Sequence, residues 1–191
     1  MKIVLASTSA YRRMLLERLQ TPFVTASPQV DEKPLATESP AATADRLARE
    51  KAWAVAGHFP DALIIGSDQV AHIGNEIFGK PGTVERAFAQ LRRMSAQTVV
   101  FHTALAVVNT RSGRVQCESV PTRVKFRELT DAEIIRYIDK EQPLDCAGSA
   151  KSEALGITLL DSLSGDDPTA LIGLPLIALS RMLRAEGVEL P

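Results

Sequence analysis

The chain has 191 residues, of which 45% are hydrophobic and 24% are charged, and its formal net charge at pH 7 is −1. This length and composition predict a folded protein with a sizeable core, and the charge balance excludes a global basic surface for a nucleic-acid polymer or a membrane. No apolar run approaches the roughly 18 residues of a membrane span, and the apolar run Ile3–Ala6 is too short for a signal peptide, so we expect a cytoplasmic protein.

The two cysteines, Cys117 and Cys146, form no CxxC pair, and we expect two reduced thiols. The three histidines are scattered along the sequence, at His58, His72 and His102. This spacing argues against a histidine-rich zinc site.

The chain opens with a predicted strand, Lys2–Ala6, and a turn of small hydroxyl residues in which Ser9 is a plausible helix N-cap. Arg12 and Arg13 fall in the first turn of the helix that follows, where a cation opposes the helix dipole. An anion at this turn would reverse that penalty, and the Ser7 hydroxyl with the free backbone N–H groups would complete a phosphate site. The alternative is two solvated arginines on a surface helix.

A second short strand is predicted at Phe23–Ala26, followed by a proline-bracketed loop that carries Asp31 and Glu32. Paired acids in such a loop are either solvated or part of a site. Ser39 and Pro40 then open a helix with cap and N1 proline in the expected order. Lys51 lies on the apolar side of that helix, where its ammonium either snorkels to the edge or faces an enclosed anion.

The segment Leu63–Gln69 begins as a short buried strand of large apolar residues. Gly66 and Ser67 at its predicted end let the backbone approach another group closely. Asp68 follows, at the place where an α/β sheet presents its chemistry, and its carboxylate could hold a metal ion or take a proton from water. The alternative is a turn at the strand end with Asp68 as a helix cap.

The segment Gly74–Pro81 nearly matches the phosphate-binding pattern G-x-x-x-x-G-K-[ST]. Pro81 supplies neither a hydroxyl for Mg²⁺ nor an N–H for a phosphate oxygen, which argues against a true P-loop. Lys80 is either presented to a phosphate by this turn or is an ordinary turn lysine.

The remaining chain is predicted to alternate helices and strands. Between the last helices lies a segment rich in small residues, Cys146–Gly156, which suits a backbone lying against a ligand or a plain loop, and it carries Lys151 and Glu153. The predicted elements are a helix Thr83–Met94, strands Thr98–Asn109 and Arg114–Phe126 joined by a hairpin with Pro121 at an edge or bulge, a helix opened by the capping box Thr130–Glu133 with Ile134, Ile135 and Ile138 inward, a strand Ile157–Leu163, a turn Gly165–Pro168 and a helix Pro175–Gly187.

Several separate segments thus carry a cation or a carboxylate at an unusual position. Cations neutralise phosphate oxygens, and acids hold a hard metal ion and activate water, so this set is typical of a magnesium–polyphosphate site. The positions are Arg12, Arg13, Glu32, Lys51, Asp68, Lys80 and Glu153, together with the hydroxyl of Ser7.

The motifs around these positions resemble the Maf family of nucleoside triphosphate pyrophosphatases. They occur in family order, as Leu5–Arg13, Val30–Glu32, Glu50–Ala52, Ile65–Gln69, Gly79–Pro81, Cys146–Ser149 with Ser152–Glu153, and Gly173–Leu176. The resemblance implies the inosine-triphosphatase-like α/β fold, with a long mixed β-sheet flanked by helices and two lobes around a central cleft. It also implies a single domain over residues 1–191, a homodimer and a divalent metal cation, Mg or Mn.

The resemblance further implies roles for individual residues. Asp68 corresponds to the proton acceptor and, with Glu32, to the metal-holding carboxylates; Lys51 and Lys80 complete the catalytic set. Ser7, Arg12 and Arg13 correspond to the phosphate-binding group. Ala10 departs from the proline that is usual in the family, which leaves the helix start less rigid and removes no functional group.

Three further positions separate the branches of the family, and here they hold Tyr11, Gln69 and Glu153. An aromatic residue, Gln and Glu resemble the branch that cleaves 7-methyl-GTP to 7-methyl-GMP and diphosphate. A methylated, positively charged purine stacks well on an aromatic ring, and a carboxylate can accept from guanine N1–H and N2 amine. The alternatives are a dTTP/UTP or broad-specificity pyrophosphatase of the same fold and a nucleotide-binding regulator of cell division.

Overall fold

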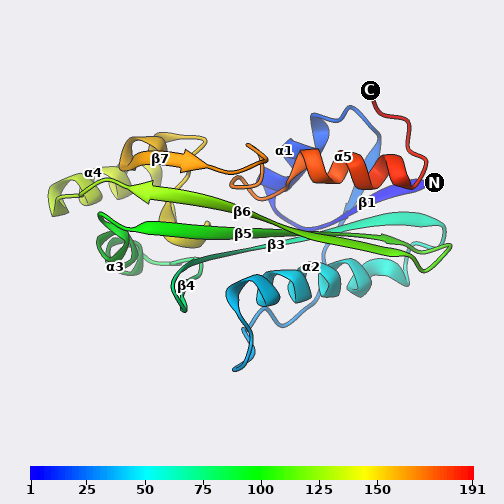
Figure 1. Cartoon of the computed structure of the whole chain (residues 1–191), viewed down its shortest axis with the longest axis horizontal. Coiled ribbons are helices and arrows are strands. Elements are labelled where there is room, and N and C mark those ends of the chain that lie inside the picture. The colour runs from blue at the N-terminus through cyan, green and yellow to red at the C-terminus, as the bar shows by residue number, and fades with distance from the viewer. The chain divides into compact units, whose positions relative to one another are not determined.

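The computed structural model describes residues 1–191 and contains a mixed β-sheet flanked by helices (Figure 1). The sheet has seven strands in the order β2-β1-β3-β5-β6-β7, and β4 pairs with β3. The strands are β1 Lys2–Ala6, β2 Phe23–Ala26, β3 Ala62–Ile73, β4 Glu76–Phe78, β5 Thr98–Asn109, β6 Val115–Phe126 and β7 Leu160–Ser164. The helices are α1 Ala10–Glu17, α2 Pro40–Ala56, α3 Val84–Met94, α4 Asp131–Glu141 and α5 Leu176–Ala185. The predicted mixed α/β class is confirmed.

The chain divides into two compact units. The first comprises residues 1–69, 103–120 and 167–191, and the second comprises residues 70–102 and 121–166. The prediction of a single domain stays a prediction. None of the helices combines the length and the apolar character that crossing a membrane requires.

In the first unit, successive residues of the parallel strands β1 and β3 face opposite sides, and each side has its own core. Ile3 and Leu5 belong to a cluster with α1 and α5, whereas Val4 and Ala6 belong to a cluster with α2. Figure 1 accordingly shows α1 and α5 on one face of these strands and α2 on the other. Both faces of β1 are therefore buried, which explains why its sequence is continuously apolar and does not alternate between apolar and polar residues.

In the second unit, α3 packs against α4 over buried aromatic and aliphatic side chains. β7 pairs antiparallel with β6 only from Arg123 to Phe126, and the register shifts between Lys125 and Phe126. β6 lies between β5 and β7 in the sheet, so the predicted edge position of Pro121 is wrong. Pro121 precedes the pairing with β7, so its missing N–H interrupts no bond to that strand.

Most predicted boundaries are confirmed to within a residue or two, including the caps Ser9, Ser39 and Thr130. The predicted strand over residues 157–163 is wrong at its start. Residues Leu155–Leu159 form a 3₁₀ helix in which the Thr158 hydroxyl donates to the Leu155 carbonyl, and the strand begins only at Leu160.

Ile135 differs from the predicted inward stripe, and two further apolar residues also lie outside the buried faces of the helices. Ile135 is half exposed, because Ile134, Tyr137 and Ile138 form the buried face of α4. Val84 is exposed at the first residue of α3. Phe59 lies beyond the end of α2, in the turn that follows Gly57.

Candidate functional site

The site is built where β3 continues past the end of β1. The pairing of β1 with β3 ends at Leu5 and Ile65, yet β3 runs on to Ile73 beside β5. The prediction that the strand ends at Gly66 is therefore wrong, and so is the alternative of Asp68 as a helix cap. Asp68 lies within the strand, buried, just beyond the last residue that pairs with β1.

Gly66 allows α2 to lie directly on β3 at this point. A Cβ atom at Gly66 would lie 2.1 Å from the carbonyl oxygen of Ala48 and 2.8 Å from the backbone nitrogen of Ala52. The predicted close backbone approach is confirmed, and its partner is the helix backbone. Lys51 lies between these two residues in the sequence, so the same contact brings its side chain to Asp68.

The ammonium of Lys51 binds two carboxylates at once. Its Nζ lies 2.6 Å from Oδ1 of Asp68 and 2.6 Å from Oε1 of Glu32. The Lys51 side chain is only 6% exposed and that of Asp68 11%, whereas Glu32 reaches the pair from an exposed loop. The Lys51 ammonium therefore faces anions away from solvent, as one of the two interpretations predicted, and the alternative that it snorkels to the edge of the helix is wrong.

Arg12 joins this cluster from the start of α1. The Ser9 hydroxyl accepts from the backbone N–H of Arg12, and the side-chain Nε donates to the carbonyl oxygen of Gly173 at 2.9 Å. Burial lowers the pKa of Arg12, while the charges of Asp68 and Glu32 act in the opposite direction. The guanidinium therefore lies within electrostatic range of both carboxylates and is not a solvated surface arginine.

Arg13 is not brought to the cluster: it is exposed and pairs with Glu17 one turn later, at 3.1 Å. Ser7 is buried at the end of β1, and its hydroxyl accepts from the backbone N–H of Ser9 at 3.1 Å. Tyr11 is half-buried on α1.

The side chain of Gln69 is hydrogen-bonded to residues 170 and 171, which belong to none of the sequence motifs. Its amide nitrogen donates to the hydroxyl of Thr103 at 2.9 Å and to the carbonyl oxygens of Ala170 and Leu171 at 3.1 and 2.9 Å. Ser67 binds the same loop through the carbonyl oxygen of Gly173, at 3.0 Å. β3 therefore fixes residues 170–173, and through Gly173 it also fixes Arg12.

Asp167 is a second participant that sequence reasoning missed. Its buried carboxylate accepts from the hydroxyl and backbone N–H of Thr169, at 2.7 and 2.9 Å, and from the backbone N–H of Ile177 at 2.7 Å. It thereby ties the loop to the first turn of α5. The predicted turn Gly165–Pro168 contained the residue, but nothing in the sequence indicated that this acid is buried.

Lys80 and Glu153 belong to the second unit, and both are exposed. The segment that resembles a P-loop is a β-hairpin of β3 and β4, with Gly74 at φ +57 in its turn, and Lys80 follows β4. Glu153 lies in the turn before the 3₁₀ helix Leu155–Leu159. Lys51, Asp68, Glu32 and Arg12 are thus the predicted residues that the first unit brings together.

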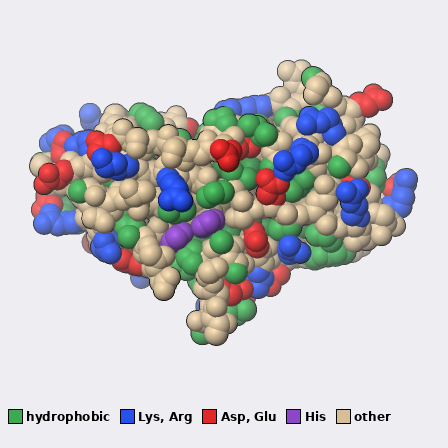
Figure 2. All heavy atoms as spheres, viewed as in Figure 1, with side chains coloured by type: hydrophobic (Ala, Val, Ile, Leu, Met, Phe, Trp, Pro, Cys, Tyr) green, Lys and Arg blue, Asp and Glu red, His purple; other side chains and the backbone are tan.

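The histidines are less scattered than the sequence suggests. The rings of His72 and His102 stack with centroids 5.3 Å apart, and Figure 2 shows histidine side chains at the surface. No group of three or more His, Cys, Asp or Glu residues is arranged to hold a metal ion. Glu32 and Asp68 offer two carboxylates around a cation, which suits Mg²⁺ because that ion takes one or two protein carboxylates and completes its shell with phosphate oxygens and water.

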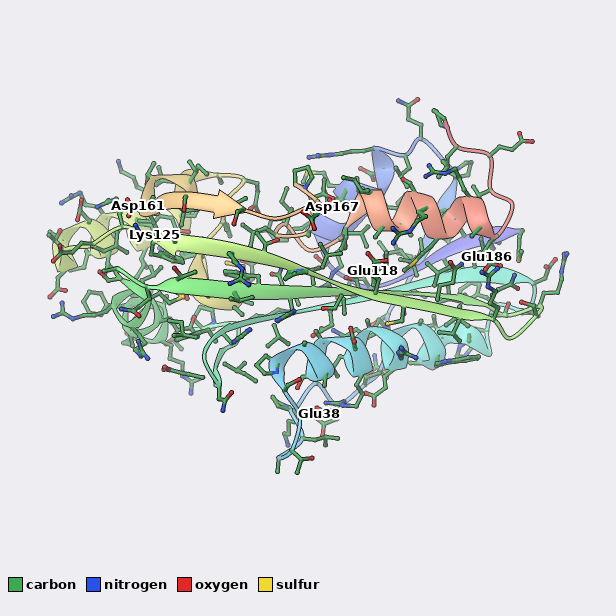
Figure 3. All side chains as sticks on the ribbon, viewed as in Figure 1. Glu38, Glu118, Lys125, Asp161, Asp167 and Glu186 are labelled. Atoms are coloured by element: carbon green, nitrogen blue, oxygen red, sulfur yellow. The ribbon has the colours of Figure 1, made fainter.

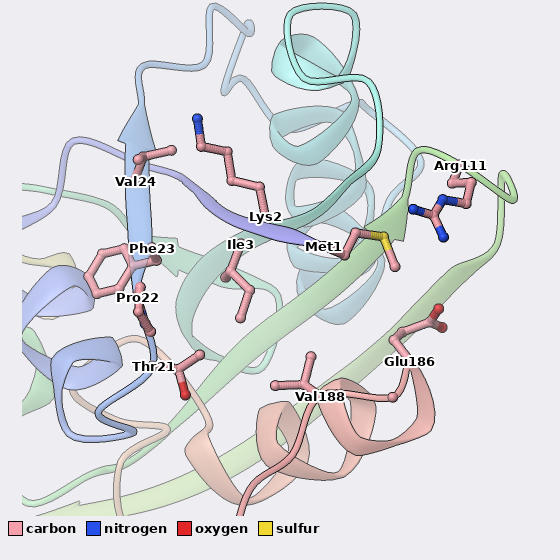
Figure 4. Close-up of a pocket in the computed structure, with 11 residues that line it drawn as sticks. Met1, Lys2, Ile3, Thr21, Pro22, Phe23, Val24, Arg111, Glu186 and Val188 are labelled. Carbon is pink, nitrogen blue, oxygen red and sulfur yellow. The ribbon is translucent and has the colours of Figure 1, made fainter.

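The first unit also contains a cavity of about 550 Å³, shown in Figure 4, at the opposite end of β1. Met1, Ile3, Phe23, Val24 and Val188 are among the side chains that line it. None of the predicted site residues lines this cavity. The candidate site is therefore the cluster around Asp68 and not this cavity.

The family profile described as Maf-like protein matches residues 2–186. The chain belongs to the Maf family. Among Maf relatives, the 7-methyl-GTP pyrophosphatase of Aromatoleum aromaticum is 75% identical over 100% of this chain and 98% of its own length. Two further relatives carry the same name. The one from Thiobacillus denitrificans is 59% identical over 98% of this chain and 93% of its own length, and the one from Polaromonas is 60% identical over 98% and 86%.

The Maf chain is also similar in fold to a solved structure, a HAM1 protein from Coxiella burnetii. That similarity has a TM-score of 0.53 at 17% identity and covers 97% of this chain and 99% of the other. It confirms the inosine-triphosphatase-like architecture that the motifs imply.

Proposed function

We propose that this protein is a nucleotide pyrophosphatase that hydrolyses 7-methyl-GTP to 7-methyl-GMP and diphosphate. The names of its full-length relatives support this reaction. The single structural observation that carries the proposal is the ammonium of Lys51 held by both Glu32 and Asp68, with Arg12 in electrostatic range.

Each residue of the cluster has a chemical task in such a reaction. Asp68 accepts the proton of the attacking water, because its buried carboxylate is fixed by Lys51. Arg12, Lys51 and Ser7 bind phosphate oxygens and stabilise the charge on the leaving diphosphate, and the family resemblance assigns the same role to Lys80. Glu32 and Asp68 would hold a divalent cation, which supplies charge neutralisation at the phosphates when bound.

The proposal is tested by the release of diphosphate from a panel of nucleoside triphosphates with Mg²⁺ or Mn²⁺. We expect Asp68→Asn to lower kcat by at least about 10²-fold, since proton transfer to a positioned base contributes that much. Asp61→Asn is the matched control, because Asp61 lies just before β3 and forms an exposed ion pair with Arg111. Near-normal turnover by Asp68→Asn would remove Asp68 from its role.

Substrate choice depends on Tyr11, Gln69 and Glu153 in this proposal. The family resemblance assigns base recognition to Tyr11, through stacking on the methylated ring, and to Glu153, through its acceptor oxygens. Within the first unit, Gln69 keeps the loop 170–171 in place. We expect Glu153→Gln to reduce the kcat/KM for 7-methyl-GTP more than that for dTTP. Turnover of dTTP well above that of 7-methyl-GTP by the unmodified protein would defeat the assignment.

The homodimer and the cytoplasmic location that the family resemblance implies belong to the same proposal. Light scattering coupled to size-exclusion chromatography tests the first, with a mass of twice 20.7 kDa as the expected result. Cell fractionation with an antibody to the native chain tests the second.

A further inference from the structure

The loop that carries Glu32 is not held by burial. Residues 27–39 connect β2 to α2, and nearly all of them are exposed, including Leu35 at 56%. A loop with so little buried apolar surface gains almost no hydrophobic stabilisation. Its position beside Lys51 must therefore come from polar contacts.

Besides the Glu32–Lys51 pair itself, the loop is held by a two-point ion pair between Glu38 and Arg46. Nε of Arg46 lies 2.6 Å from Oε1 of Glu38, and Nη2 donates to Oε2 at 2.9 Å. The two side chains are only 14% and 21% exposed. Parallel charge-assisted bonds of this kind fix orientation as well as distance. Figure 3 shows Glu38 where the loop enters α2.

The same two side chains also bind the backbone of the loop. Nη2 of Arg46 donates to the carbonyl oxygen of Lys33 at 3.0 Å, and the backbone N–H of Leu35 donates to Oε2 of Glu38 at 3.1 Å. Lys33 is the residue next to Glu32. One guanidinium therefore holds both the end of the loop and the residue adjacent to the functional acid.

α2 thus reaches this loop through two cations, Arg46 and, five residues later, Lys51. We propose that Arg46 and Glu38 are positioning residues that hold residues 32–38 so that Glu32 stays beside Lys51 and Asp68, and that they thereby set the affinity of the site for a divalent cation and its triphosphate. The part of this inference that concerns the ligand rests on the proposed function.

The ion pair is intact at every pH at which the protein would work. The hydrogen bond from Arg46 is the main cause that lowers the pKa of Glu38 to about 2, and the same contact raises the pKa of Arg46. A merely local role is the competing explanation, since Glu38 also accepts from the Thr43 hydroxyl in the first turn of α2.

Hydrogen–deuterium exchange and metal activation separate these roles. In Arg46→Ala we expect the Leu35 and Glu38 amides, which are hydrogen-bonded within the loop, to exchange about tenfold faster, because charge-assisted bonds are lost. We expect the Mg²⁺ concentration for half-maximal activity to rise about tenfold in Arg46→Ala and in Glu38→Gln, with kcat at saturating Mg²⁺ within about threefold of the unmodified value. The double variant should be no worse than either single variant, because the two residues act as one unit.

Glu50→Gln is the matched control. Glu50 contacts Nη1 of the same guanidinium at 3.0 Å but lies within α2 and outside the loop, so its replacement should change neither readout. If Arg46→Ala fails to fold, Arg46→Lys replaces it, since lysine keeps the charge and loses the two-point geometry.

The two readouts also distinguish the failure of this inference from the failure of the proposed function. Unchanged amide exchange in Arg46→Ala overturns the positioning role whatever the activity. Faster exchange with an unchanged Mg²⁺ requirement overturns the link to the cation. Absence of nucleotide hydrolysis by the unmodified protein overturns the proposed function, and the exchange experiment with the same variants still decides whether Arg46 and Glu38 hold the loop.

Discussion

Replacement of Gly66 by alanine should separate α2 from β3 and disable the site. The added Cβ would lie 2.1 Å from the Ala48 carbonyl oxygen, and real Cβ atoms essentially never approach closer than 3.0 Å, so the helix must retreat by about 1 Å. Overpacking against backbone that cannot rotate away costs about 3 kcal/mol. For a chain of 191 residues this corresponds to a fall in melting temperature of about 6–12 °C.

The same displacement moves Lys51 away from Asp68, and a misplacement of about 1 Å can cost about 10²-fold in rate. Thermal unfolding followed by circular dichroism and kcat with 7-methyl-GTP measure the two effects. Gly57→Ala is the control: Gly57 has φ −63 and no atom within 4 Å of an added Cβ, so the free energy of unfolding should change by less than about 1 kcal/mol. A Gly66→Ala protein that melts within about 2 °C of the unmodified chain would refute the packing argument.

Three further predictions concern the helix caps, the acid range and the thiols. Thr130→Ala removes the capping box of α4 and should cost about 1 kcal/mol, a fall of about 2–4 °C in melting temperature, whereas Thr130→Ser should restore most of it. The pKa of Glu38 and that of Glu133 are both lowered to about 2, so the stabilisation from these ionised carboxylates is complete above pH 4.5 and is lost as the pH falls toward 2. In Glu133→Gln the melting temperature should therefore fall less steeply between pH 4.5 and pH 2, and an unchanged pH dependence would contradict this. Burial raises the pKa of Cys146 to about 12, so iodoacetamide at pH 7.5 should label it slowly in the folded protein and fast in urea, as mass spectrometry would show.

Local sequence signals predicted the elements well because their causes are local. A hydroxyl residue before a helix, such as Ser39 or Thr130, satisfies free N–H groups a few residues away and needs no partner elsewhere in the chain. The hairpin at Gly74 was obscured by its near-match to a phosphate loop, although Gly-Asn between apolar runs is itself a hairpin signal. The length of β3 was underestimated because its sheet neighbour β5 is distant in sequence and so left no local signal.

The site was predicted only where a side chain carries an unusual charge. Lys51 was marked by its place on an apolar face, and the structure supplies the reason, a pair of carboxylates from two other segments. Arg13 shares the sequence signal of Arg12 and yet lies outside the cluster, because neighbouring residues of one helix turn point in different directions. The roles of Thr103 and Asp167 depend on a long-range loop contact and had no local signal.

The carbonyl oxygen of Gly173 has a consequence for mutational scanning. This single backbone atom receives both Arg12 and Ser67, and no substitution can delete it. A side chain at position 173 would keep the acceptor and would instead force an L-residue to φ +125, so a damaged variant would report conformational strain and not the lost anchor. This shared acceptor is therefore invisible to alanine scanning, and it can be probed only through its two side-chain donors or by an ester in place of the peptide bond.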